Sequence, residues 1–131
     1  MKLLKLLENA ISEIPAEDKR DALGVYHDWC FQNRVQFGFS DSDRIFEKYY
    51  AQGKIEELEV SKIKTHYDWG RRPDSKTPPI VMRLKNDALI VLDGQHRIFV
   101  AKDKGIANLK CFVFDLPLRY SKPTKKYLLD E

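Results

Sequence analysis

The sequence predicts a single α+β domain in which a helical N-terminal region, residues 1–53, packs on a small mixed sheet formed by residues 54–115. Three observations favour this class. Apolar residues recur every three or four positions in the first half of the chain, whereas the second half has short apolar runs and alternation. The chain of 131 residues has the size of one domain, and no internal repeat divides it. Residues 116–131 are expected to form an exposed or frayed tail.

Helical periodicity accounts for the N-terminal region. The spacing of leucine and isoleucine predicts a first helix over 3–14, which the following proline ends. A second helix is expected over about 16–32. Ser40 and Asp43 resemble a capping box that starts a third helix, and Gly53 stands where a left-handed residue follows a helix end.

Strands around one short helix are expected in the second half. Loose alternation over 58–63 is typical of a half-buried strand. The apolar runs 80–84 and 89–92 are joined by turn-forming residues and predict a hairpin. A helix is expected over 95–104, and the last strand, 109–114, is apolar on both faces and is expected inside the sheet.

The composition is that of a folded protein in water. Hydrophobic residues make up 43% and charged residues 33% of the chain, which supplies one core and argues against disorder. A net charge of +3 and a pI of about 8.8 do not by themselves indicate a nucleic-acid-binding protein. Cys30 and Cys111 lie among apolar residues, as buried reduced thiols do. Because no apolar run approaches the ~18 residues of a membrane span, we expect a cytoplasmic protein without membrane contact.

One segment carries chemistry, at the turn where a hydrophobic strand ends in Asp93-Gly94 and a helix begins at Gln95. Backbone N–H groups point out of such a turn, and the helix dipole favours an anion there. His96 and Arg97 fall in the first helical turn, where cations are disfavoured unless an anion offsets them. The turn therefore suits recognition of a phosphate.

Each residue of the turn has a candidate role. Gly94 and Gln95 offer backbone amides, His96 a proton or hydrogen bond, and Arg97 a fork for two phosphate oxygens. Asp93 and His96 are the candidate catalytic residues, Asp93 to orient water, a metal-bound water or a hydroxyl, and His96 to contact the phosphate. The structural alternative is that Asp93 only caps the helix and Arg97 pairs with Asp93 or another surface carboxylate.

The same turn carries a family likeness. The relevant residues are Asp93-Gly94-Gln95-His96-Arg97, then Ala101, Lys102 and Gly105, with Pro78-Pro79-Ile80-Val81 before them. This pattern resembles the ParB/sulfiredoxin superfamily, whose members carry D-G-x-H-R or G-E-R-R at such a turn, and the likeness covers roughly residues 57–115. The resemblance implies a ParB/sulfiredoxin-like sheet and a nucleotide, ATP or CTP with Mg²⁺, held through its phosphates.

The branches of the superfamily imply different activities. Sulfiredoxins need a cysteine where Gln95 stands, and since an amide is no nucleophile, sulfiredoxin chemistry is not expected. Chromosome-partition ParB proteins bind CTP at this turn, but a helix-turn-helix domain and a dimerisation tail follow, for which the residues after Asp115 are too few. A branch that phosphorylates free serine has a histidine followed by a catalytic glutamate, where this sequence has His66 and then Tyr67.

The kind of activity is left open between a nucleotide hydrolase, a phosphotransferase and a binding module. Asp68 and Glu59 are weaker acid–base candidates. In the long loop between 64 and 77, Arg71 and Arg72 are candidate contacts to the phosphate, or a solvated pair. No residues have metal-ligand spacing, so a divalent ion is expected to arrive with the nucleotide.

The competing class is a DNA-associated, partition-like or nuclease-like accessory protein of a plasmid, phage or mobile element. In this class a DNA phosphate occupies the same turn, and further basic side chains extend the surface. Those side chains are Arg71, Arg72, Arg83, Arg119, Lys122, Lys125 and Lys126. Their grouping on one face would favour DNA, whereas scattering would favour a small nucleotide. A protein-binding module that keeps a relic site would bind neither ligand.

Overall fold

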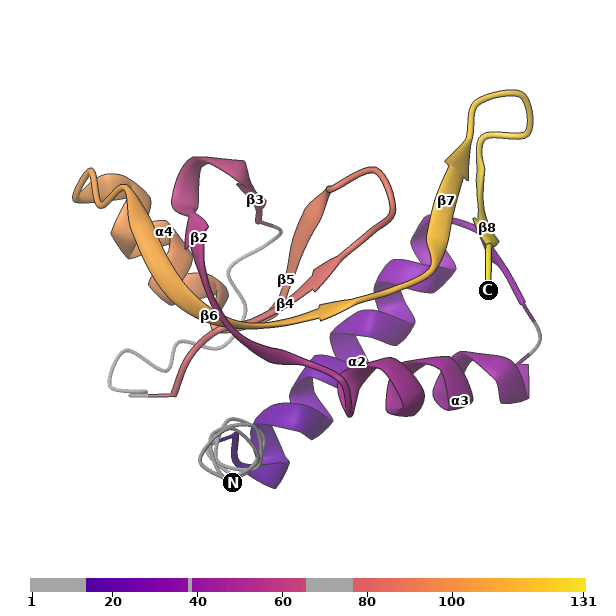
Figure 1. Cartoon of the computed structure of the whole chain (residues 1–131), viewed down its shortest axis with the longest axis horizontal. Coiled ribbons are helices and arrows are strands. Elements are labelled where there is room, and N and C mark those ends of the chain that lie inside the picture. Colours follow the sequence, from indigo (N-terminus) through magenta and orange to yellow (C-terminus); the bar gives the residue numbers. More distant parts are fainter. Residues whose placement is uncertain (1–13, 38, 66–76) are drawn as a thin grey trace, which may run out of the picture.

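The computed structural model describes residues 14–37, 39–65 and 77–131. In this part of the chain it contains three α-helices and two mixed sheets, so the fold class is α+β, as the sequence predicts (Figure 1). The helices are α2 (Ala16–Gln32), α3 (Phe39–Tyr50) and α4 (Gln95–Asp103), with a short 3-10 helix, η1 (Val60–Lys62). The expected first helix, apart from its last residue, lies outside the described residues.

The strands form a five-stranded sheet with the order β2-β6-β4-β5-β3 and a three-stranded sheet with the order β1-β8-β7. Their bounds are β1 (Val35–Gln36), β2 (Lys54–Glu59), β3 (Ile63–Lys64), β4 (Ile80–Arg83), β5 (Leu89–Asp93), β6 (Asn108–Asp115), β7 (Leu118–Ser121) and β8 (Lys126–Leu129). The predicted hairpin is confirmed as the antiparallel pair β4–β5. The inner position predicted for β6 is confirmed too, because β6 pairs with β2 on one side and β4 on the other.

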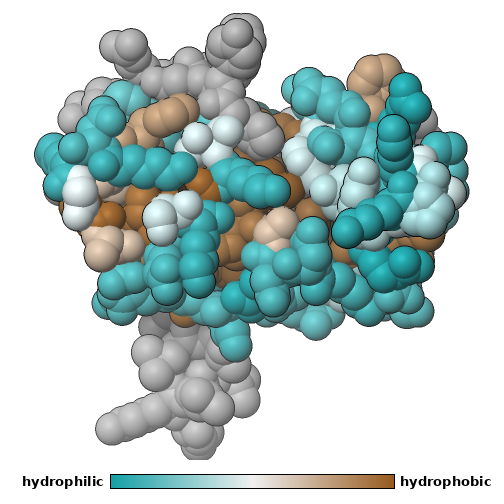
Figure 2. All heavy atoms as spheres, turned by 90° about the horizontal axis from the view of Figure 1, so that it is seen from above, coloured by the Kyte–Doolittle hydropathy of each residue, from teal (hydrophilic) through white to brown (hydrophobic). Residues whose placement is uncertain are grey.

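Helices cover both faces of the five-stranded sheet. Successive residues of a strand face opposite ways, so Ile80 and Met82 join the core beneath α2 and α3, while Val81 joins the core beneath α4. From α4, Ile98 and Ala101 are buried in this second core. Hydrophobic residues appear in the middle of the face in Figure 2, with hydrophilic ones around them.

Both cysteines are buried, one in each core, which confirms the prediction from their apolar neighbours. Burial raises the pKa of the Cys30 thiol to about 12 and that of Cys111 to about 12. The positive charge of the Arg97 guanidinium acts to lower the pKa of Cys111, so Arg97 lies within electrostatic reach of β6.

Two expectations are wrong. The strand predicted over 58–63 ends at Glu59, because the chain turns through η1, where the backbone N–H of Val60 donates to the carbonyl of Ala107 at 2.9 Å. Leu58 and Val60 are buried on either side of this change, so their alternation does not reveal it. Residues 116–131 are also not a frayed tail. They form the hairpin β7–β8, which pairs with β1 and buries Leu118 fully.

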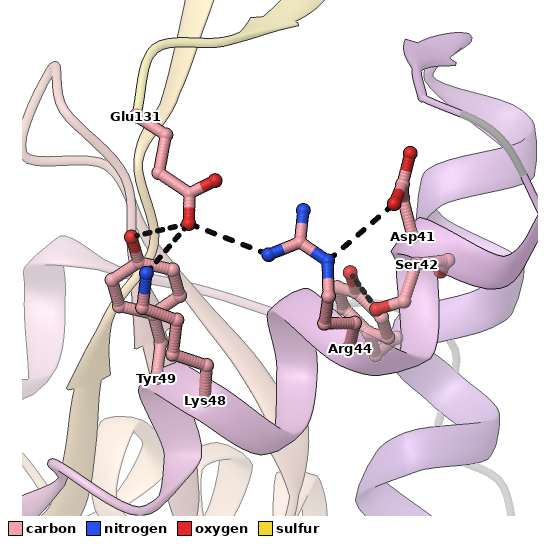
Figure 3. A network of polar contacts seen from close by, with 7 residues as sticks. Asp41, Ser42, Arg44, Lys48, Tyr49 and Glu131 are labelled. Atoms are coloured by element: carbon pink, nitrogen blue, oxygen red, sulfur yellow. Dashed lines mark hydrogen bonds and ion pairs between the residues drawn. The ribbon is translucent and has the colours of Figure 1, made fainter.

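The end of this hairpin is tied to α3 by a polar network (Figure 3). Glu131 Oε1 accepts hydrogen bonds from Lys48 Nζ at 2.8 Å and from the Tyr49 hydroxyl at 3.2 Å. Arg44 Nη1 lies 3.6 Å from the same oxygen, and Arg44 Nε lies 3.4 Å from Asp41. The network joins residues more than 80 positions apart in the chain.

The network predicts a pH-dependent attachment of β8. The Lys48 hydrogen bond holds the pKa of Glu131 below its ordinary value of 4.5. A carboxyl group with a depressed pKa stabilises the fold above its ordinary pKa and ceases to do so as the pH falls through its folded value. We therefore expect the hydrogen-exchange protection of the β8 amides to decrease once the pH is lowered below about 4.5. In Glu131→Gln the same amides should already be less protected at pH 6.5. Equal protection in both proteins at pH 6.5 would show that the network does not hold β8.

Candidate functional site

Asp93, Gly94, Gln95, His96 and Arg97 form the turn between β5 and α4, as the sequence predicts. The turn depends on Gly94, whose φ of 82° and ψ of 23° are left-handed. A Cβ atom at this position would lie 3.0 Å from the backbone Cα of Pro79. Conformation and space therefore both require glycine here, which places the start of α4 directly against the segment that precedes β4.

The start of α4 has the features of an anion site. Its N-cap is Gly94, which makes no side-chain capping bond, and no acidic residue occupies the first turn. The backbone N–H groups of Arg97 and Ile98 both reach the carbonyl of Gly94, at 3.1 and 3.3 Å. The structural alternative placed Asp93 at the cap position. In the structure Asp93 is instead the last residue of β5, half-buried and paired with Ile80 beside a β-bulge.

Arg97 ties the turn to the helix layer on the other face of the sheet. Its Nη1 donates to the backbone carbonyl of Thr77, and the Thr77 hydroxyl donates to Asp18 Oδ2 at 2.8 Å. Asp18 is only 5% exposed and lies in the first turn of α2, where the helix dipole favours a carboxylate. Within the described residues Arg97 thus contacts a backbone carbonyl and not the surface carboxylate that the structural alternative expects.

Tyr50, the last residue of α3, also belongs to this region, and the sequence analysis gave it no role. Its ring lies 4.9 Å from that of Phe112, whose backbone N–H donates to the carbonyl of Pro79 at 2.8 Å. Its hydroxyl is buried and has no hydrogen-bond partner in the described part of the chain. Burial raises the pKa of Tyr50, and the carboxylates of Asp18 and Asp93 raise it further. A protonated donor therefore lies within electrostatic reach of the residue that ends β5. No sequence signal marks it, because Tyr50 has ordinary helical spacing.

The unpaired hydroxyl predicts an unusual response to mutation. Tyr50→Phe removes a buried donor that is unsatisfied in the free protein, so we expect the free energy of unfolding to rise by about 1 kcal/mol. Tyr26→Phe is the matched control, since the Tyr26 hydroxyl donates to the carbonyl of Ser42 at 2.9 Å and its loss should cost about 1 kcal/mol. Chemical denaturation measures both. Equal destabilisation by the two variants would mean that the Tyr50 hydroxyl has a partner.

The remaining predicted residues are not assembled at the turn by the described structure. Arg71, Arg72 and Asp68 lie outside the described residues. Glu59 is described and exposed, at the end of β2. In the sheet register Asp93 on β5 is aligned with Ile55 on β2, and the strands β4 and β6 lie between them. Glu59 lies four residues beyond Ile55 along β2 and is therefore further still from the turn. The acid–base role considered for Glu59 at the turn is therefore not supported.

The basic residues of the DNA-associated class do not gather at the turn either. Arg83 is clamped between two carboxylates: its Nη1 and Nη2 each lie 3.1 Å from Glu56, and its Nε lies 2.6 Å from Asp115. These hydrogen bonds raise the pKa of Arg83, and the two carboxylates neutralise its positive charge on the sheet. The other basic residues of this class that the structure describes lie on the β7–β8 hairpin, at the opposite end of the molecule's long axis from α4 (Figure 1). They are Arg119, Lys122, Lys125 and Lys126.

Among the described residues, histidine, cysteine and acidic side chains form no group of three or more that could hold a metal ion. None of the helices in that part of the chain is both long and apolar enough to cross a membrane. Comparisons with protein-family models and with curated proteins find no match to this chain.

Proposed function

We propose that this domain binds a nucleotide, ATP or CTP with Mg²⁺, through its phosphates at the β5–α4 turn. The observation that carries the proposal is the turn itself, in which Gly94 is left-handed and α4 starts without an acidic residue. His96 and Arg97 occupy the first turn of this helix. A bound phosphate offsets their positive charge and that of the helix dipole together. The motif's resemblance to the ParB/sulfiredoxin superfamily supports the same assignment.

The proposed cradle consists of the Gly94 and Gln95 amides with the side chains of His96 and Arg97. A guanidinium has five N–H donors in one plane, and the bond to the Thr77 carbonyl uses one of them. That bond fixes the plane of the group, so the remaining donors approach a phosphate without a large loss of side-chain entropy. Arg71 and Arg72 are proposed as further phosphate contacts.

Titration calorimetry tests binding directly. ATP, ADP and CTP, each with Mg²⁺, are titrated into the protein, and at least one is expected to give saturable heat and to raise the melting temperature. A ligand that binds only the folded state stabilises it by about 2.7 kcal/mol at a hundredfold excess over Kd. Neither heat nor stabilisation with any of the three at millimolar concentration would overturn the proposal.

Any phosphoryl transfer or hydrolysis at the turn is assigned to Asp93 and His96. Asp93 would orient water or the metal ion beside the phosphate, and His96 would contact the phosphate itself. Asp93→Asn is then expected to reduce phosphate release by about a hundredfold while nucleotide affinity is largely kept. If Asp93→Asn retained turnover while Arg97→Ala abolished it, Asp93 would have no catalytic role.

A DNA-associated role is the second candidate. The observation that favours it is the grouping of Arg119, Lys122, Lys125 and Lys126 on one hairpin. Retention of DNA with a steep decrease at rising salt, without binding of free nucleotides, would make this the main function.

A further inference from the structure

We infer that Asp18 is a positioning residue for the nucleotide turn and that, through Thr77, it fixes the orientation in which Arg97 meets the phosphate. The inference rests on the proposed function, and it extends the phosphate site to α2, on the opposite face of the five-stranded sheet from α4. Two hydrogen bonds in series make the link. Arg97 Nη1 donates to the backbone carbonyl of Thr77, and the Thr77 hydroxyl donates to Asp18 Oδ2 at 2.8 Å.

Asp18 is buried although the start of its helix does not require this. It is 5% exposed, and no other charged side chain in the described ranges is buried to this extent. Removing a carboxylate from water is costly unless the group is hydrogen-bonded or paired. A carboxylate in the first turn often caps the backbone N–H of the N-cap residue, but the N-cap of α2 is Pro15, which has no N–H. Glu17, in the same turn, is exposed and already places a negative charge beside the helix dipole.

The segment that Asp18 contacts has little freedom of its own. Two prolines with fixed φ angles follow Thr77, and a residue before a proline favours extended backbone. The sheet holds the far end of this segment, because the backbone N–H of Phe112 donates to the carbonyl of Pro79 at 2.8 Å. The hydrogen bond to Asp18 holds the near end. Asp18 therefore fixes the residue whose carbonyl accepts the bond from Arg97.

The orientation of Arg97 matters because a guanidinium binds phosphate best as a planar fork that meets two oxygens at once. The N–H groups that do not donate to Thr77 keep a fixed direction as long as the Thr77 carbonyl stays in place. Once that carbonyl is released, the Arg97 side chain has to be ordered by the nucleotide itself. Ordering one long side chain on binding lowers affinity by about two- to tenfold.

Titration calorimetry tests the link, with Mg²⁺–ATP or Mg²⁺–CTP, whichever the unmodified protein binds more tightly. Asp18→Ala removes the acceptor, and Thr77→Val removes the hydroxyl but keeps the backbone carbonyl. Each is expected to weaken binding by about two- to tenfold. The double variant should lose no more than either single variant, because both changes break the same link. Losses that multiply in the double variant, or unchanged affinity in either single variant, would overturn the inference.

Two conservative variants keep the link. Thr77→Ser retains the hydroxyl, and Asp18→Asn retains an oxygen that accepts its hydrogen bond while the negative charge is lost. Both should bind the nucleotide within about twofold of the unmodified protein. If Asp18→Asn lost as much affinity as Asp18→Ala, the charge of Asp18 and not its hydrogen bond would be responsible, which would contradict the inference.

Tyr26→Phe is the control for a general loosening of α2. The Tyr26 hydroxyl donates to the carbonyl of Ser42 at 2.9 Å, so this variant also removes a hydrogen bond between a side chain of α2 and another segment. It should lower stability and leave nucleotide affinity unchanged. An affinity loss equal to that of Asp18→Ala would mean that Asp18 only stabilises the helix.

A second measurement follows Arg97 without any nucleotide. NMR relaxation of its Nε–Hε group gives an order parameter, which should decrease in Asp18→Ala and in Thr77→Val but not in Tyr26→Phe. Absence of nucleotide binding by the unmodified protein would overturn the proposed function. Nucleotide binding by the unmodified protein, with an unchanged Arg97 order parameter in Asp18→Ala, would overturn only the positioning role of Asp18.

Discussion

Gly94→Ala is expected to lower the free energy of unfolding by about 2–4 kcal/mol. Left-handed backbone costs a residue with a Cβ about 1–2 kcal/mol, and a Cβ 3.0 Å from the Pro79 backbone adds the cost of overpacking. The backbone of Pro79 cannot yield easily, because its carbonyl accepts the hydrogen bond from Phe112 in the sheet. Urea denaturation measures the loss.

Two other glycines separate the contributions. Gly105 is left-handed, with a φ of 69°, but has open space around it, so Gly105→Ala should cost only about 1–2 kcal/mol. Gly24 lies within α2 with nothing within 4 Å, so Gly24→Ala should stabilise the protein by about 0.5–1 kcal/mol. If the Gly94 and Gly105 variants lost the same stability, the close approach to Pro79 would contribute nothing. A neutral Gly94 variant would contradict the geometry of the turn.

Arg97→Ala is expected to weaken nucleotide binding by about ten- to a hundredfold, because each charge-assisted hydrogen bond lost costs about 1.5–3 kcal/mol. Arg97→Lys keeps the positive charge but not the planar guanidinium group. Its affinity for the nucleotide should therefore lie between that of Arg97→Ala and that of the unmodified protein. Titration calorimetry with the nucleotide that binds most tightly measures the three proteins.

This substitution also removes the bond to Thr77, so stability needs its own control. Lys102, at the far end of α4, donates from Nζ to the carbonyl of Ile63 at 2.9 Å. Lys102→Ala therefore removes one side-chain bond from α4 to a backbone carbonyl, as Arg97→Ala does, and should lower stability similarly. Only Arg97→Ala should lower affinity. Equal affinities in the two variants would mean that Arg97 holds the fold and does not contact the phosphate.

Local signals predicted the elements that hold the turn. Helical periodicity gave the bounds of α2, the turn residues after Leu84 predicted the β4–β5 hairpin, and Gly94 and Gly105 delimited α4. Each of these signals lies within a few residues of the feature it predicts. Such features depend on local backbone conformation and side-chain spacing, which can be inferred from neighbouring residues in the sequence.

Contacts between distant segments explain what the sequence did not reveal. The hairpin β7–β8 is held by parallel pairing with β1, more than 90 residues earlier, and no local pattern marks it. Asp18 has the spacing of a solvated helix residue, but it is buried, and its carboxylate accepts a hydrogen bond from the Thr77 hydroxyl, 59 residues further along the chain. Tyr50 likewise joins the polar surroundings of Asp93 only through the packing of α3.

Backbone amide chemical shifts, followed by NMR during titration with Mg²⁺–ATP and Mg²⁺–CTP, report directly on whether the nucleotide binds at the β5–α4 turn. We expect the amides of Gly94, Gln95, His96 and Arg97 to shift and saturate together, while those of β7 and β8 do not move. Saturable shifts confined to other residues, or no shift at these four amides at millimolar nucleotide, would contradict a phosphate site at the β5–α4 turn.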